Sequence, residues 1–177
     1  MIETVVAYDP RWPDAFEREA AELVAAWPGR GVMIHHIGST SVPGMVAKPI
    51  IDMLAVVTSL ADAERASIAL MGCGYEAKGA YGIEGRRYFR KSDSRGIRTH
   101  HLHAYEQGSP HIARHLAFRD YLRASSERAA SYSALKLAIV AGKDAPDLSY
   151  VEAKAPLVAR IDAESAQWCL QQTGVER

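Results

Sequence analysis

The sequence predicts an α+β fold, in which a mixed sheet of about five strands is flanked by helices and the C-terminal third is helical. Short β-branched runs bounded by glycine and proline alternate with amphipathic segments up to residue 108, and only helical patterns follow. Three strand patterns in succession between residues 75 and 105 indicate a meander added to two earlier strands. We expect residues 1–177 to form a single domain, because this length can bury one core.

The first half of the chain supplies two helices and two strands. A β-prone run covers residues 4–7, and Asp9 and Pro10 then read as the N-cap and first residue of a helix that ends near Trp27. A strand is expected at residues 31–37, followed by a loop over 38–49 with room for one helical turn. A buried strand over 50–57 and a helix over 60–71 come next.

The second half supplies the meander and the remaining helices. Strands are predicted at 75–78, 86–91 and 97–105, and helices at 110–123 and 127–141. A last helix is expected to start at Asp147 and to break or kink at Pro156, since an interior proline removes a hydrogen bond and clashes with the preceding turn.

Composition narrows the classes of function. Hydrophobic residues make up 48% and charged residues 24% of the chain, which are ordinary globular values. The net charge of zero argues against nucleic acid or an anionic membrane as a partner. Two cysteines, Cys73 and Cys169, are too few for a disulfide framework. Acidic residues within the first 20 exclude a signal-peptide core, so we expect a soluble cytoplasmic protein.

The loop at residues 38–44 combines glycines with small hydroxyl residues. Such a loop can turn successive backbone N–H groups toward a phosphate, or it can simply be a tight turn between two strands. It is not a Walker A loop, because Pro43 and the late Lys48 break that spacing.

Asp52 is the one charged residue of the predicted strand at 50–57. A carboxylate there is costly unless it is paired with a metal ion, with backbone N–H groups, or with a cation such as Lys48 or Arg90. On a later strand, His101 and His103 project to one face, which suits a metal pair or an acid/base and phosphate-binding pair.

Other histidines and arginines are less specific. His111 and His115 have helical spacing but lack the glutamate of a metalloprotease motif, so a solvated or partly buried helix face is expected. Arg119 and Arg123 are i, i+4 neighbours that can act as an anion clamp, although most such arginines form surface ion pairs.

Four ordered blocks of the sequence resemble the signature of the GrpB family. They are HIGSTSVPGMVAKPIID at residues 36–52, THHLHA at 99–104, FRDYLR at 118–123 and YSALK at 132–136. The resemblance covers nearly the whole chain. It implies a nucleotidyltransferase-like fold, and it relates the chain to domains fused behind dephospho-CoA kinase in some bacteria and described there as accessory domains.

The resemblance also implies roles for single residues. Gly38 and Ser39 would precede the catalytic strand and contact nucleotide phosphates, and Asp52 would be the first metal carboxylate. Active transferases of this superfamily usually carry a second carboxylate two residues later, where this chain has Leu54. This departure leaves open a one-metal site with mixed Asp/His ligands, or binding without turnover.

Three functions follow from these residues. The first is metal-dependent nucleotidyl or phosphoryl transfer on a nucleotide or other small phosphorylated ligand. The second is a non-catalytic binding module, and the third is a metal-dependent hydrolase built on the Asp/His cluster. The groups expected to hold Mg²⁺ or Mn²⁺ and to act in catalysis are Asp52, His101 and His103. The groups expected to bind phosphate are Gly38, Ser39, Thr40, Lys48, Arg119, Arg123 and Lys136.

Overall fold

The computed structural model describes residues 4–29, 31–142 and 148–174. Within these ranges one mixed sheet forms, with the strand order β1-β2-β5-β4-β3. The neighbouring strands β2 and β5 are parallel, and the other neighbouring pairs are antiparallel. The strands are β1 (Met33–Ile37), β2 (Ile51–Val57), β3 (Tyr75–Ala77), β4 (Arg86–Ser92) and β5 (Arg98–Glu106). The predicted mixed sheet is confirmed, and β3, β4 and β5 form the expected meander.

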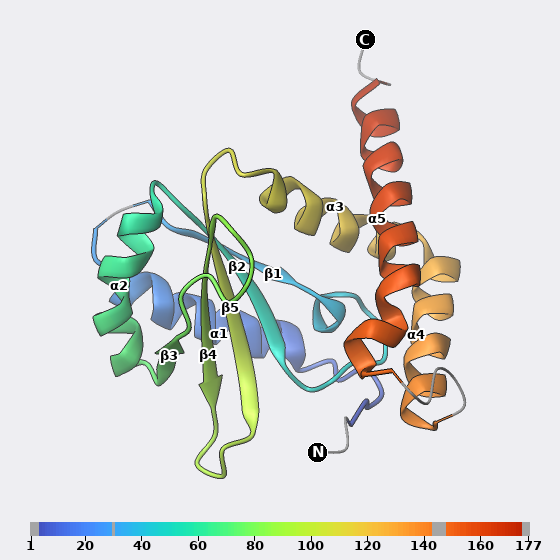
Figure 1. The fold of residues 1–177 in the computed structure, drawn as a ribbon, viewed down its shortest axis with the longest axis horizontal. Coiled ribbons are helices and arrows are strands. Elements are labelled where there is room, and N and C mark those ends of the chain that lie inside the picture. The colour runs from blue at the N-terminus through green and yellow to red at the C-terminus, as the bar shows by residue number, and fades with distance from the viewer. Residues whose placement is uncertain (1–3, 30, 143–147, 175–177) are drawn as a thin grey trace.

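The helices divide into two groups (Figure 1). The first group, α1 and α2, packs on one face of the sheet, while the C-terminal helices lie together beside it, as predicted for a helical C-terminal third. The bounds are α1 (Trp12–Ala26), α2 (Leu60–Gly72), α3 (Pro110–Ala124), α4 (Ser126–Val140) and α5 (Tyr150–Gly174). None of the helices in the described ranges is both long and apolar enough to cross a lipid bilayer.

Alternation along β2 explains why one of its faces is core and the other carries the polar group. Its residues Met53 and Ala55 are fully buried against α1 and α2 in the largest apolar cluster. Asp52 and Leu54 point the other way, where Leu54 packs with Ile37, Tyr105 and α3. The strand therefore presents its carboxylate on the face that α1 and α2 leave uncovered.

The chain between β1 and β2 connects the sheet to the helices. It contains one short 3₁₀ turn, η1 (Ser39–Ser41), as the loop prediction allowed. Val42 and Met45, just after this turn, are buried in a second apolar cluster with Leu122, Tyr132 and Ile161 of the C-terminal helices. The turn is thus held between the sheet and the helical part.

One prediction about the N-terminal segment needs correction. The first helix begins at Trp12, not at Pro10, because Asp9 binds the backbone N–H and the guanidinium of Arg11 and so closes a turn before the helix. The β-prone run at residues 4–7 contributes a single antiparallel bridge, between Val6 and Ala47.

Of the predicted break or kink at Pro156, the break does not occur. Helix α5 is continuous from Tyr150 to Gly174 with Pro156 inside it, while the predicted start at Asp147 lies outside the described residues. An interior proline costs about 3 kcal/mol. Leu157, Val158 and Ile161, which follow the proline, pack into the helical apolar cluster, and this burial offsets the cost.

Candidate functional site

The turn after β1 requires glycine at its first position. Gly38 has φ +70°, a conformation that residues with a side chain rarely adopt. A Cβ atom at this position would lie 2.6 Å from Asp52 Oδ2 and 2.9 Å from Asp52 Cβ. The absence of a side chain therefore lets the turn lie directly against the carboxylate of Asp52.

Hydroxyl groups fix the shape of the turn. Ser41 Oγ donates to the carbonyl of Gly38 at 2.6 Å, and Thr40 Oγ1 lies 3.0 Å from His36 Nε2. His36 is buried and stacks on Phe16, with ring centroids 4.7 Å apart. Burial and then the nearby charge of Arg123 lower the pKa of His36 to about 4. This imidazole is therefore neutral at pH 7, and its contact with Thr40 helps to hold the turn in place.

Asp52 meets the two histidines of β5 across the parallel strand pair. His101 is its register partner, and His101 Nδ1 lies 3.0 Å from Asp52 Oδ1. His103 Nε2 lies 4.0 Å from the same oxygen. Burial alone would raise the pKa of Asp52, but the hydrogen bond with His101 and the nearby His103 ring outweigh it and hold that pKa far below its usual range. The carboxylate is thus ionised.

The partner considered for Asp52 on β4 does not pair with it. Arg90 donates to Glu76 at 2.8 Å. Asp52 therefore contacts histidines, where an ion pair with Arg90 was one of the predicted alternatives. Lys48, the other cation considered, has its Nζ 3.9 Å from the centroid of the Tyr150 ring.

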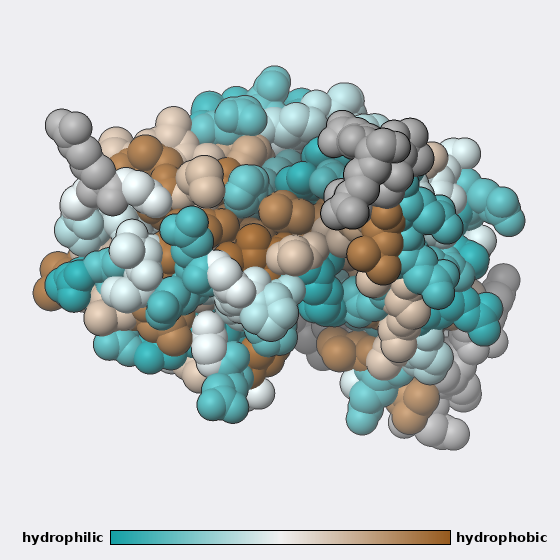
Figure 2. Space-filling view, turned by 90° about the horizontal axis from the view of Figure 1, so that it is seen from above, coloured by the Kyte–Doolittle hydropathy of each residue, from teal (hydrophilic) through white to brown (hydrophobic). Residues whose placement is uncertain are grey.

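The turn, Asp52 and His101 line a cavity of about 290 Å³ between the sheet and helices α4 and α5. Ser39, Thr40, Asp52 and His101 line it from the sheet side. Its basic residues, which face this one carboxylate, are Lys48, Arg98, Lys136 and Lys154. Figure 2, with the sheet to the left and α4 and α5 to the right, shows the molecular edge hollowed between the two parts. The predicted turn, the acid and one of the two predicted histidines, His101, therefore share one cationic cavity, whereas His103 is not part of its lining.

Lys136 crosses from α4 to the turn. Its side chain is 2% exposed, and its Nζ donates to Ser39 Oγ at 2.9 Å and to the carbonyl of Val46. The same Nζ lies 4.4 Å from the centroid of the Tyr132 ring. Burial and then the charge of Lys154 lower the pKa of Lys136 to about 7. An anion in the cavity would restore this charge, because it supplies the missing counter-ion.

Sequence reasoning missed several residues around Asp52. Tyr88 of β4 packs its ring on His101 and His103, at centroid distances of 5.5 and 5.2 Å. Arg86 Nη1 lies 3.5 Å from His103 Nδ1. The sequence pattern that could have identified both residues is the period of two along β4, which places residues 86, 88 and 90 on one face of the strand.

His115 lies on a partly buried helix face, one of the two predicted alternatives, and it extends the histidine cluster. Its ring lies 5.9 Å from that of His103, and burial lowers its pKa to about 3. It is therefore a neutral imidazole at pH 7. Arg98, Tyr150 and Lys154, which line the cavity, carry no local sequence signal for this role.

Arg119 and Arg123 are not brought to this cavity. Arg119 donates to the carbonyl of His36 at 3.1 Å and to both oxygens of Asp120, and Arg123 donates to the carbonyl of Ser41 at 2.9 Å. The two arginines therefore hold the backbone at either end of the turn from its other side. They line a separate groove.

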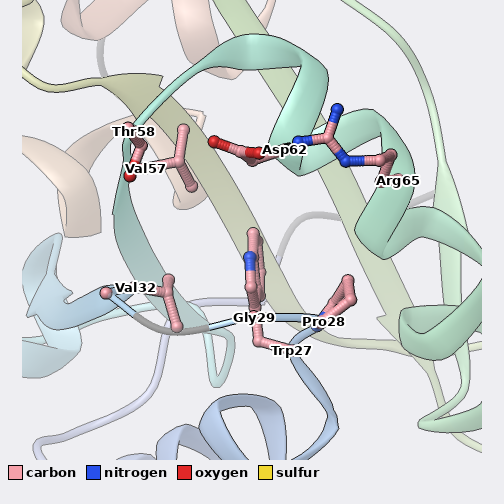
Figure 3. A pocket seen from close by; sticks show the side chains of 9 residues that line it. Trp27, Pro28, Gly29, Val32, Val57, Thr58, Asp62 and Arg65 are labelled. Atoms are coloured by element: carbon pink, nitrogen blue, oxygen red, sulfur yellow. Dashed lines mark hydrogen bonds and ion pairs between the residues drawn. The ribbon is translucent and has the colours of Figure 1, made fainter.

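Another cavity, of about 410 Å³, lies at the far end of β2, beside Val57. In Figure 3, Asp62 and Arg65 of α2 lie on one side of it and the segment from Trp27 to Gly29 on the other. Asp62 and Arg65 form an ion pair with each other. This cavity shares no lining residue with the one at Asp52.

The Asp52 cluster has the composition of a site that could hold a divalent ion. One ligand atom each from Asp52, His101 and His103 lie within 4.8 Å of one another, which is close enough for the three residues to hold one ion after small side-chain shifts. In addition, His101 Nε2 is buried without a hydrogen-bond partner. Two imidazole nitrogens and one carboxylate suit Mn²⁺ or Zn²⁺ better than Mg²⁺, which prefers oxygen ligands.

Solved structures resemble this fold at two levels. The GrpB protein from Enterococcus faecalis matches with a TM-score of 0.84 and 38% identity, over 94% of this chain and 99% of that one. A Cid1 poly(U) polymerase with Mg 3′-dATP bound matches with a TM-score of 0.51 and 13% identity, over 76% of this chain and 42% of the polymerase. A cytoplasmic RNA terminal U-transferase has a TM-score of 0.52, with 10% identity over 74% of this chain and 40% of the transferase. The fold is therefore nucleotidyltransferase-like, as predicted.

Relatives by sequence include UPF0157 protein YqkA of Bacillus subtilis, 40% identical over 93% of this chain and 47% of that protein. UPF0157 protein BH1888 of Halalkalibacterium halodurans is 36% identical over 89% of this chain and 80% of that protein. The chain thus spans about half the length of YqkA and most of BH1888. Residues 3–164 match the family model described as GrpB protein. On these matches, the chain belongs to the GrpB family.

Proposed function

We propose that the cavity at Asp52 binds the phosphates of a nucleoside triphosphate together with one divalent ion, and that the chain transfers a nucleotidyl or phosphoryl group. The observation that carries this proposal is the convergence of a Gly–Ser turn, an ionised carboxylate and four basic side chains in one cavity. The nucleotidyltransferase-like fold supports it, because one structure of that fold has Mg 3′-dATP bound.

Each group has a distinct task in this proposal. Asp52, His101 and His103 would hold the ion, for which Mn²⁺ is the better match, and the ion would supply positive charge that polarises a phosphoryl group. On the turn side, the backbone N–H of Ser39 and the ammonium of Lys136 would donate hydrogen bonds to phosphate oxygens. Lys48, Arg98 and Lys154 would neutralise the remaining phosphate charge from the helical side and the sheet edge.

Leu54 argues for a single ion. It lies two residues after Asp52 on the same face of β2 and is fully buried against Ile37 and Tyr105, so it supplies no second carboxylate. We therefore propose one metal ion with mixed nitrogen and oxygen ligands, and not the pair of oxygen-bound ions that two carboxylates would hold.

The second candidate is a binding module without turnover. The missing second carboxylate favours it, and so does the similarity to the dephospho-CoA kinase of Mycobacterium bovis, which is 29% identical over 93% of this chain and 46% of the kinase. In this version the cavity would present a phosphorylated ligand to another protein. The third candidate, a metal-dependent hydrolase, would need the Asp/His cluster but no nucleotide.

Calorimetric titration of ATP and UTP into the purified chain with Mn²⁺ tests the proposal. We expect saturable binding that is at least about tenfold weaker in Asp52→Asn, because the ionised carboxylate is lost. Asp14→Asn, at an exposed aspartate in the first turn of α1, is the matched control and should bind as the wild type does.

Product analysis separates the three candidates. Release of pyrophosphate with attachment of the nucleotide to an acceptor indicates transfer, and binding without products indicates a module. Release of phosphate from simple phosphate esters by the Mn²⁺-loaded chain indicates a hydrolase. Absence of nucleotide binding by folded protein with either Mn²⁺ or Mg²⁺ would overturn the proposal.

A further inference from the structure

A groove of about 620 Å³ lies on the other side of the turn from the Asp52 cavity. Helix α1 contributes Pro13 and Phe16, strand β1 contributes His35, and helix α3 contributes Arg119 and Arg123. No residue lines both this groove and the Asp52 cavity. The groove is therefore separate from that cavity, and residues of the turn and of α3 both contribute to it.

The charge on the α3 wall is incompletely balanced. Arg119 donates to both oxygens of Asp120, and Arg123 Nη1 lies 3.8 Å from one of these oxygens. Two guanidinium groups therefore share one carboxylate. Burial and then the charge of Arg119 lower the pKa of Arg123 as well as that of His35. Glu17, on the opposite α1 wall, is the acidic residue of the lining. An anion beside Arg123 would relieve this like-charge repulsion.

The remaining wall is aromatic and apolar. Tyr8, Phe16 and Pro43 line the groove, and the Phe16 ring is held in place by its stack on His36. Such a wall favours a flat or apolar group next to the anion. The lining thus suits a small molecule with a ring at one end and a negative charge at the other.

We propose that this groove binds a second ligand, a small organic anion whose carboxylate or phosphate lies against Arg119 and Arg123 and whose ring lies against Tyr8 and Phe16. The same arginines bind the carbonyls of His36 and Ser41, at both ends of the turn that faces Asp52. Binding in the groove is therefore linked by two hydrogen bonds to the turn of the Asp52 cavity.

Histidine side-chain NMR on the full chain provides the test, because His35 lines the groove and His101 lines the other cavity. The probes are benzoate, phenyl phosphate and the neutral control phenol. We expect at least one of the two anions to shift the His35 ring signals saturably and more than those of His101, and phenol to bind at least about tenfold more weakly. The anion that binds identifies the charged group.

Substitutions on α3 test where in the groove the charged group of the anion binds. Arg123→Gln should weaken the binding of that anion about tenfold or more, whereas Arg123→Lys keeps the charge and should retain most of the affinity. Arg114→Gln, on the same helix but paired with Asp162 outside the groove, is the matched control and should bind as the wild type does. Unmoved His35 signals, equal binding of phenol, or full affinity in folded Arg123→Gln would overturn the proposal.

Discussion

Gly38 is the residue at which the turn and the acid of the site meet. Its positive φ and its contact with the Asp52 carboxylate are two separate reasons for glycine. The sequence pointed to a special loop here, but the second reason is visible only in three dimensions. A side chain at position 38 would push against the group that we propose holds the metal ion.

A comparison of Gly38→Ala with Gly44→Ala separates the effect of backbone strain from the effect of the contact with Asp52. Gly44 also has a positive φ, at +77°, but a Cβ there meets nothing within 4 Å. We expect both variants to lose about 1–2 kcal/mol of unfolding free energy from backbone strain. Gly38→Ala should lose more than this and should also bind Mn²⁺ more weakly, as measured by thermal unfolding and calorimetry. Equal effects of the two substitutions would contradict the contact with Asp52.

His36 makes the stability of the chain depend on pH. Its pKa is about 4 in the folded chain and 6.5 for a free imidazole, so the unfolded chain binds the proton first as the pH falls. The free energy of unfolding should be at its full value above pH 6.5 and should fall toward pH 4, by up to about 3 kcal/mol. Urea unfolding at several pH values measures this loss. In His36→Gln the slope over this range should be reduced, and an unchanged slope would rule out His36 as its source.

At the scale of elements, the parallel pairing of β2 and β5 builds the site. It sets Asp52 opposite His101, which no spacing in the sequence specifies, because the two residues come from strands separated by a helix and two other strands. The strand period of two did predict that His101 and His103 share a face. The partners of Arg119 and Arg123 were not predictable, since i, i+4 spacing on a helix says nothing about a backbone carbonyl of another segment.

Leu54→Asp tests the role of β2 in limiting the site to one acid. The leucine is fully buried with Ile37 and Tyr105, so a carboxylate there should lower the free energy of unfolding by about 3 kcal/mol or more. The control Leu54→Met keeps the volume and should cost less than about 1.5 kcal/mol. Chemical denaturation measures both. A stable Leu54→Asp chain that binds a second metal ion would show that the strand tolerates the carboxylate pair after all.

At the scale of the whole molecule, the Asp52 cavity exists only where the sheet and the C-terminal helices meet. Ser39 and Asp52 come from the sheet side, while Lys136 and Lys154 come from α4 and α5. The fold class was predictable from strand and helix periods, and the GrpB resemblance identified Lys136. Lys154 and Tyr150 were missed because helical patterns specify which residues are apolar, not which cavity a polar residue reaches.

The most direct test of the central claim is a crystal structure of the chain grown with Mn²⁺ and a non-hydrolysable nucleoside triphosphate, with the ion located by its anomalous scattering. We expect one Mn²⁺ bound by Asp52, His101 and His103, with phosphate oxygens at Ser39 and Lys136. A nucleotide bound elsewhere, or an Asp52 cavity without ion or phosphate in crystals that contain both, would contradict the account.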